Sequence, residues 1–198
     1  MIKWEETTEK FQHMVKWAGL PVPTYYTHRI ETFKPNKGNA GALKSVLQYI
    51  NSPEHHFLAL AGEVGRGKTH LAFGIAYCYI EKERIVKYWR VSNLLETMRN
   101  WYRQERQIGK SPIEWAMEVD LLILDDLGGE KKSEWADERL EDVIDHRYLN
   151  HKDTVFTTNM SLTQLTPRIA SRIKEGVLVL LEGVDYREDI AKRRGLKL

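Results

Sequence analysis

Short apolar runs alternate with helical patterns along most of the chain. A short run of consecutive apolar residues predicts a buried strand, and apolar residues three and four positions apart predict an amphipathic helix. We expect five strands, at residues 57–61, 85–91, 121–125, 154–158 and 177–181. Parallel strands need long crossover connections, which helices usually supply. The pattern therefore predicts an α/β fold with a five-stranded, mainly parallel sheet flanked by helices.

Helical patterns fill the intervals between these strands. We expect helices at residues 42–51, 68–83, 93–104, 112–118, 133–150 and 162–173. An earlier amphipathic helix is expected at residues 5–17, before a break at Gly19, Pro21 and Pro23, and residues 32–39 are expected to form a loop. Ligands of such sheets bind at the carboxyl ends of the strands, so chemistry is expected there.

The first expected strand runs directly into a glycine-rich segment. This segment matches the phosphate-binding pattern G-x-x-x-x-G-K-[ST] at every fixed position, and its residues are Gly62, Glu63, Val64, Gly65, Arg66, Gly67, Lys68 and Thr69. Its glycines let backbone N–H groups wrap around an anion at the start of the following helix. We expect Lys68 to reach the β- and γ-phosphates of ATP and the Thr69 hydroxyl to ligate Mg²⁺, with His70 completing the cofactor-binding set. An unoccupied glycine-rich turn is the alternative.

A second magnesium-binding group is expected at the end of the strand at residues 121–125. Four apolar residues there lead into Asp125 and Asp126. We expect Asp125 to hold Mg²⁺ through water and Asp126 to orient or deprotonate the attacking water. Many ATPases have a glutamate in the second position, so the shorter Asp126 is expected to make hydrolysis slow. Asn159, directly after the strand at 154–158, is the candidate sensor of the γ-phosphate, and a turn-forming asparagine is the alternative.

Composition and charge narrow the class of protein. The 198 residues are 42% hydrophobic and 29% charged, as in ordinary globular domains, and no apolar run is long enough to span a membrane. The charged start of the chain lacks a secretory signal, and the single cysteine, Cys78, cannot form an internal disulfide. We therefore expect a cytoplasmic protein without a membrane partner.

The charges are unevenly distributed along the chain. Between Lys87 and Lys110 there are six Lys or Arg residues and two Glu, whereas between Asp125 and Asp145 there are nine acidic residues and three basic ones. Separated basic and acidic faces suit a polyanion on one side and a partner or a metal on the other. Ordinary solvated helix faces explain the distribution equally well.

Several motifs together resemble one family of P-loop proteins. They lie at residues 65–71, 121–128, 147–148, 157–159, 168–172 and 185–187. In this combination the chain is similar to the DnaC/IstB-like AAA+ ATPases. The resemblance implies a P-loop NTPase of the AAA+ class, in the ASCE group. It also implies an N-terminal helix and leading segment at residues 1–40 and an ATPase domain at residues 41–198, without a separate lid domain.

The resemblance also implies roles for several arginines. Arg172, with Arg168 as second choice, matches the arginine that such ATPases offer to the nucleotide of an adjacent subunit. An isolated chain would then hydrolyse ATP poorly, and a nucleotide-dependent homo-oligomer is implied. A surface arginine on a helix is the alternative. Arg147 is either part of a structural ion pair or a phosphate sensor, and the role of Arg187 is similarly open.

The stretch between the second and third expected strands matches the position of a family element associated with single-stranded DNA. It brings cations and aromatic side chains close together, which suits phosphate contact and base stacking. The candidate DNA-binding residues are Arg99, Trp101, Tyr102, Arg103, Arg106 and Lys110. Burial of Trp101 in the core is the alternative.

The family resemblance implies an accessory of DNA replication. We expect MgATP to order the subunits, and the oligomer to deliver a DnaB-like replicative helicase to single-stranded DNA. Loaders of this family have a separate helicase-binding domain, whereas only residues 1–40 precede the ATPase core here. Either residues 1–17 form a minimal docking helix, or the chain is truncated, or its partner is not a helicase.

Two other functions compete with helicase loading. Within the same fold, a transposition helper would bind duplex DNA and recruit a transposase. From a different class, a P-loop small-molecule or nucleotide kinase would need an arginine-rich substrate lid and would turn over as a monomer without DNA. Binding to a hexameric helicase separates the first two functions, and dependence on DNA and on oligomerisation separates both from the kinase.

Overall fold

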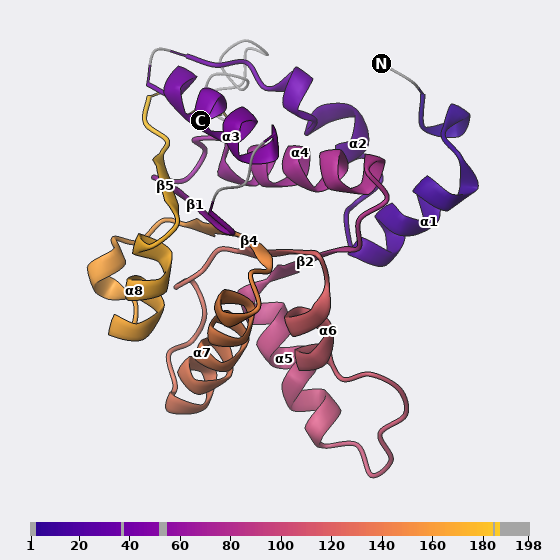
Figure 1. Cartoon of the computed structure of the whole chain (residues 1–198), viewed down its shortest axis with the longest axis vertical. Coiled ribbons are helices and arrows are strands. Elements are labelled where there is room, and N and C mark those ends of the chain that lie inside the picture. Colours follow the sequence, from indigo (N-terminus) through magenta and orange to yellow (C-terminus); the bar gives the residue numbers. More distant parts are fainter. Residues whose placement is uncertain (1–2, 37, 52–54, 184, 187–198) are drawn as a thin grey trace, which may run out of the picture.

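The sheet is built from five parallel strands (Figure 1). The computed structural model describes residues 3–36, 38–51, 55–183 and 185–186. The strands are β1 (Phe57–Ala61), β2 (Val86–Arg90), β3 (Leu121–Asp125), β4 (Asp153–Thr158) and β5 (Val177–Leu180). They lie in the order β2-β3-β4-β1-β5, and every pair of neighbours is parallel. The predicted α/β fold with a five-stranded, mainly parallel sheet is confirmed.

Helices cover both faces of this sheet. They are α1 (Glu9–Ala18), α2 (Thr24–Thr27), α3 (Ala40–Asn51), α4 (Lys68–Glu81), α5 (Val91–Tyr102), α6 (Pro112–Glu118), α7 (Glu134–Leu149) and α8 (Pro167–Lys174), with short 3₁₀ turns η1 (Trp4–Glu6), η2 (Ile30–Thr32) and η3 (Leu162–Gln164). None of the described helices is long and apolar enough to cross a membrane.

Each face of the sheet has its own core, because successive strand residues point to opposite sides. Leu58 and Leu60 of β1 pack in one hydrophobic cluster with α1 to α4. Phe57 and Ala59 of the same strand pack in a second cluster with α5 to α8. Strand β1 is therefore packed on both faces, against α4 in the first core and α8 in the second.

The N-terminal segment packs on α4 as part of the first core. Val15 of α1, Tyr25 of α2 and Ile30 of η2 are buried in the same cluster as α4. Gly74 in α4 permits this close approach, because a Cβ there would lie 2.7 Å from the Ile30 side chain. The described part of residues 1–40 therefore shares a core with the sheet, and the boundary at residue 40 stays a prediction.

Two helices begin later than the sequence pattern predicts, because of their caps. The helix expected at 162–173 is divided into η3 and α8. Thr166 precedes Pro167, which disfavours helical backbone at residue 166, and its side chain accepts a hydrogen bond from the Ile169 N–H. The helix expected at 5–17 begins only after Thr8, whose side chain accepts from the Phe11 N–H.

Candidate nucleotide site

The glycine-rich loop at residues 62–67 joins β1 to α4 at the carboxyl end of the sheet. Gly65 and Gly67 have φ angles of 77° and 93°, in the left-handed region that glycine adopts without strain. Gly67 is the N-cap of α4. Backbone N–H groups of the loop therefore meet the positive end of a helix dipole, an arrangement that suits the phosphates of a nucleotide.

The other predicted residues of the loop region make local contacts. Glu63 and Arg66 form an ion pair, Arg66 also donates to the Gly183 carbonyl, and Val64 is exposed. His70 faces the N-terminal segment, where its Nε2 lies 2.9 Å from the Arg29 carbonyl oxygen. Burial lowers the pKa of the His70 imidazole. The structure thus places His70 beside the N-terminal segment, and its predicted part in nucleotide binding stays a prediction.

Lys68 and Thr69 begin α4 and point to the end of the sheet. Lys68 is buried, and its Nζ donates to the carbonyl oxygens of Gly62 and Glu63 at 2.7 and 2.6 Å. Thr69 Oγ1 donates to Asp125 Oδ1 at 3.0 Å. The structure therefore brings together the two residues that the sequence assigns to magnesium, although they lie on different elements.

Asp125 ends β3 and is surrounded by hydroxyl groups. The Thr157 hydroxyl donates to its Oδ1 at 2.6 Å, and the Tyr88 hydroxyl donates to its Oδ2 at 2.9 Å. Burial and the negative charge of Asp125 raise the pKa of Tyr88 well above its usual value. Neither contact was predicted from the sequence. The contact of Tyr88 with Asp125 depends on the order of the strands, and Thr157 was noted only as part of a family motif.

Mg²⁺ fits the donor set at the end of β3. Mg²⁺ prefers oxygen ligands and is commonly held by one or two carboxylates, substrate phosphates and water. Thr69 and Asp125 present a hydroxyl and a carboxylate oxygen in direct contact beside the phosphate loop. No cluster of three or more His, Cys, Asp or Glu side chains suited to a metal occurs among the described residues, so a magnesium ion here would depend on the nucleotide for further ligands.

Asp126 and Asn159 lie next to each other, one residue beyond the ends of β3 and β4. Asn159 Nδ2 lies 3.4 Å from Asp126 Oδ1. Asp126 has a φ of 62°, and its N–H donates to the Thr157 hydroxyl at 2.9 Å. Arg90, at the end of β2, donates to Asp126 Oδ2 through Nη2 at 2.6 Å and Nε at 3.2 Å. Two guanidinium nitrogens of Arg90 thus hold one oxygen of the Asp126 carboxylate, a contact that sequence reasoning did not identify.

A segment after β5 crosses the phosphate loop. The Tyr186 N–H donates to the Gly65 carbonyl at 3.0 Å, and the Tyr186 ring lies 5.9 Å from the ring of Phe33. The Asp185 carboxylate lies against Gly65, where an added Cβ would come within 2.0 Å of Asp185 Oδ1. A negatively charged side chain thus lies at the loop that is expected to bind phosphate. Arg187, the next residue of this motif, lies outside the described residues.

Arg172 and Arg168 lie far from this loop. Both belong to α8, and both form ion pairs with Asp145 of α7. Arg172 lines a pocket with Phe57, the first residue of β1, and Gly176, which precedes β5. This is the amino end of the strands, opposite the phosphate loop.

Arg147 has a structural position. It is fully buried, and its guanidinium donates to carbonyl oxygens that include those of Ala116, Val119 and Asp153, and to the Thr154 hydroxyl. Burial lowers its pKa to about 10. Its hydrogen-bond partners among the described residues are carbonyl groups at the end of α6, directly after it and at the start of β4, together with one hydroxyl, and no carboxylate is among them, so the structure shows neither of the two roles considered for Arg147.

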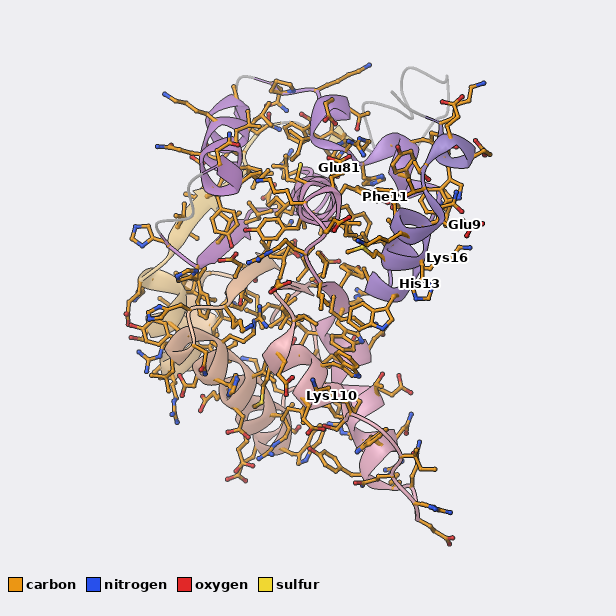
Figure 2. All side chains as sticks on the ribbon, turned by 45° about the vertical axis from the view of Figure 1, so that its right-hand side comes forward. Glu9, Phe11, His13, Lys16, Glu81 and Lys110 are labelled. Atoms are coloured by element: carbon orange, nitrogen blue, oxygen red, sulfur yellow. The ribbon has the colours of Figure 1, made fainter. Side chains whose placement is uncertain are left out.

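The candidate DNA-binding residues lie on α5 and on the connection from α5 to α6, which extends away from the sheet (Figure 1). Tyr102, Arg103 and Arg106 are exposed, and Trp101 is half-buried. The Arg99 guanidinium lies 4.7 Å from the Trp135 ring centroid. Lys110, labelled in Figure 2, forms an ion pair with Glu118. With Arg99, which is also exposed, four of the six candidate side chains lie at the surface.

The geometry at the carboxyl end of the sheet defines a P-loop NTPase of the AAA+ class. A glycine-rich loop leads from β1 into α4, and Thr69 of that helix contacts the aspartate that ends β3. The chain belongs to the family described as IstB-like ATP binding protein, whose model matches residues 6–171. It is a nucleotide-binding ATPase of the DnaC/IstB-like group.

Two of the relatives are proteins of DNA replication. The chain is 21% identical over 174 residues to the replicative helicase loader DnaC of Escherichia coli, covering 86% of this chain and 71% of DnaC. It is 23% identical to the chromosomal replication initiator protein DnaA of Acholeplasma laidlawii, covering 85% of this chain but 39% of DnaA. The ATPase is thus related to helicase loaders and to DnaA.

Solved structures show the same fold. The DnaC helicase loader superposes with a TM-score of 0.72 at 24% identity, over 82% of this chain and all of that structure. AMPPCP-bound DnaA from Aquifex aeolicus gives a TM-score of 0.72 at 22% identity, over 87% of this chain. The chain spans 57% of that DnaA structure, so the comparison concerns the ATPase fold alone.

Proposed function

We propose that this chain is an ATP-dependent loader of a replicative helicase, acting in the cytoplasm as a homo-oligomer on single-stranded DNA. It binds MgATP, hydrolyses it slowly, and is stimulated by oligomerisation and by DNA. The observation that carries the proposal is the contact between Thr69 and Asp125 beside the phosphate loop, in a chain related to a replicative helicase loader over most of its length.

The nucleotide chemistry follows from the side chains at the loop. Lys68 shifts its ammonium group from the loop carbonyls to the β- and γ-phosphates. Thr69 and Asp125 would hold Mg²⁺, which would neutralise phosphate charge when bound. Asp126 orients the attacking water, and Asn159 contacts the γ-phosphate. Because Asp126 is paired with Arg90, the isolated chain is expected to be a slow ATPase.

Assembly of copies completes the catalytic site. Arg172 lies at the opposite end of β1 from the loop, so it serves the nucleotide of an adjacent copy, where its positive charge stabilises the transferring phosphoryl group. Arg168, on the same helix and paired with the same aspartate, is the second choice. Stimulation by oligomerisation follows directly, because each active site needs two chains.

Single-stranded DNA is proposed to bind the projection between α5 and α6. Tyr102, Arg103 and Arg106 are exposed there and combine a stacking ring with cations for the backbone. Arg99, Trp101 and Lys110 are proposed to contribute at its base. One solved relative is a DnaA bound to AMPPCP and single-stranded DNA, which supports a nucleic-acid partner for this fold.

A loading assay tests the proposal. The hexameric replicative helicase of the same genome is mixed with this chain, ATP and a single-stranded circle, and the DNA-bound helicase is quantified. We expect loading with the natural chain and none with Lys68→Ala. Failure to bind the helicase, with or without ATP, would remove the proposal.

A transposition helper is the second candidate, and the IstB-like name of the matching family favours it. Such a protein would bind duplex DNA and recruit a transposase. The two candidates differ in their preferred DNA. Tighter binding to a duplex than to a single strand of equal length, together with capture of a transposase from the same genome, would favour the second.

A further inference from the structure

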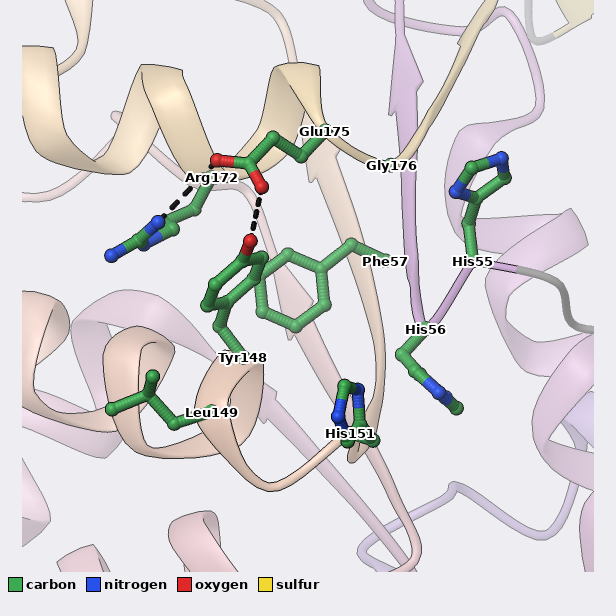
Figure 3. A pocket seen from close by; sticks show the side chains of 9 residues that line it. All are labelled: His55, His56, Phe57, Tyr148, Leu149, His151, Arg172, Glu175 and Gly176. Atoms are coloured by element: carbon green, nitrogen blue, oxygen red, sulfur yellow. Dashed lines mark hydrogen bonds and ion pairs between the residues drawn. The ribbon is translucent and has the colours of Figure 1, made fainter.

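A pocket of about 340 Å³ lies at the amino ends of β1 and β5 (Figure 3). Phe57 begins β1 and Gly176 directly precedes β5. The pocket wall also contains Arg172, Tyr148, Glu175 and three histidines. Its size falls at the lower end of the range for ligand pockets, roughly 300–1,000 Å³. The pocket can therefore receive part of a ligand, such as a phosphate chain.

The chain's own nucleotide cannot reach this pocket. The phosphate loop follows Ala61 at the other end of β1, and five residues of strand separate the two sites. At about 3.3 Å per residue, the Cα atoms of Phe57 and Ala61 are about 13 Å apart, with the packed sheet between them. A triphosphate that contacts Arg172 must therefore belong to a second copy of the chain.

Tyr148 holds the Arg172 side chain in a defined plane. The Arg172 guanidinium lies over the Tyr148 ring, with its Cζ 4.1 Å from the ring centroid. On its edges, Nε donates to Asp145 Oδ1 at 3.0 Å and Nη1 donates to Glu175 Oε1 at 3.3 Å. The Tyr148 hydroxyl donates to the other oxygen of Glu175 (Figure 3). A guanidinium stacked on a ring keeps its edges available for hydrogen bonds.

The two carboxylates differ in how easily they can be replaced. The Asp145 side chain is 13% exposed and also binds Arg168, whereas the Glu175 side chain is 46% exposed. Asp145 therefore acts as a fixed anchor. Glu175 occupies the edge of Arg172 that an incoming phosphate would need, and its exposure allows it to turn away into solvent.

We propose that Tyr148 is a positioning residue for Arg172, whose guanidinium its ring orients toward the nucleotide of a second copy of the chain. This inference rests on the role of Arg172 under the proposed function. The Tyr148 ring sets the plane of the guanidinium, Asp145 fixes its Nε edge, and a phosphate oxygen of the second copy replaces Glu175 at Nη1.

Mixing two variants with impaired ATPase activity isolates the role of Tyr148. Arg172→Ala chains bind ATP but lack the arginine, and Lys68→Ala chains cannot bind ATP but still offer Arg172 to a neighbour. We expect ATPase activity to return in the mixture. The test then replaces the Lys68→Ala donor with Lys68→Ala/Tyr148→Leu. Because this donor binds no ATP, Tyr148 can affect the rate only through the neighbour's site.

The expected results separate a stacking role from a hydroxyl role. The Tyr148→Leu donor lowers kcat of the mixture about tenfold and leaves KM for ATP unchanged, because the arginine is present but poorly oriented. A Tyr148→Phe donor keeps the ring and restores the rate to within about twofold. Equal activity with the Leu and Tyr donors would overturn the positioning role while leaving the proposed function intact.

Two controls keep these outcomes distinct. If Lys68→Ala does not restore any activity to Arg172→Ala, one copy does not supply its arginine to another, and the proposed function fails at that step.

Tyr148 also packs on Phe57, with ring centroids 6.0 Å apart, so Tyr148→Met is tested as a second donor without a ring that fills similar space. Thermal unfolding of each donor identifies any variant that does not fold.

Discussion

The two ends of strand β1 differ in whether one chain alone supplies the contacts of a nucleotide site. At the carboxyl end, Thr69 and Asp125 contact each other beside the phosphate loop. At the amino end, Arg172 contacts Asp145, Glu175 and Tyr148. This end of the strands is opposite the end that carries the phosphate loop. The first end is arranged to bind a nucleotide within one chain. Under the proposed function, the second end acts in catalysis only when another copy of the chain is present, so substitutions at the two ends should have separable effects.

Replacing Lys68 with alanine should have the largest effect, on binding itself. We expect Lys68→Ala to weaken ATP binding at least about 100-fold, the size seen when one partner of a buried charged contact is removed. Calorimetric titration with MgATP measures this change. Lys44→Ala, an exposed lysine on α3, is the matched control and should bind as the natural chain does. Unchanged affinity in Lys68→Ala would place the nucleotide elsewhere.

Replacing Arg172 with alanine should leave binding intact and lower hydrolysis. We expect the DNA-stimulated rate to fall at least about tenfold, because a positive charge at the transferring phosphoryl group is lost. Lys174→Ala is the matched control, since Lys174 is an exposed cation on the same helix. Steady-state ATPase assays with and without single-stranded DNA give both rates. A silent Arg172→Ala would show that the amino end of β1 has no catalytic role.

Some of the contacts at the two ends of β1 could be predicted from the sequence, and others could not. The phosphate loop was predictable because its residues are contiguous, and the approach of Asp125 to it because parallel strands end at one edge of a sheet. Arg90 and Tyr88 were not, because their contacts depend on β2 lying beside β3, with Arg90 opposite Asp125. Arg147 matched a family motif, but only the fold shows that its guanidinium is buried among carbonyl groups. Tyr148 belongs to the same motif, and its contact with Arg172 joins two helices that are distant in sequence.

Removing the contact between Arg90 and Asp126 should change the basal ATPase rate at the carboxyl end of the sheet. We expect Arg90→Ala to raise the basal ATPase rate about threefold, because the Asp126 Oδ2 atom loses both guanidinium donors and can accept a hydrogen bond from the attacking water. The rate of dilute protein without DNA is the measurement, since it excludes the contribution of a second copy. A fall in this rate would mean that Arg90 supports catalysis and does not restrain it.

The smallest expected effect concerns Asp185 above the phosphate loop. We expect Asp185→Asn to tighten ATP binding about two- to threefold, because a negative charge that repels the phosphates is removed and water screens much of it. Titrations at low and high salt check the cause, since the gain should shrink as salt rises. Weaker binding would indicate that Asp185 assists the nucleotide.

Whether two copies share one catalytic site can be measured from the specific ATPase rate as a function of protein concentration. We expect a low rate for dilute chains that rises with concentration to a plateau, because Arg172 of one copy completes the site at Lys68 and Asp125 of another. A specific rate that stays constant from nanomolar to micromolar protein, and equals that of Arg172→Ala throughout, would contradict it.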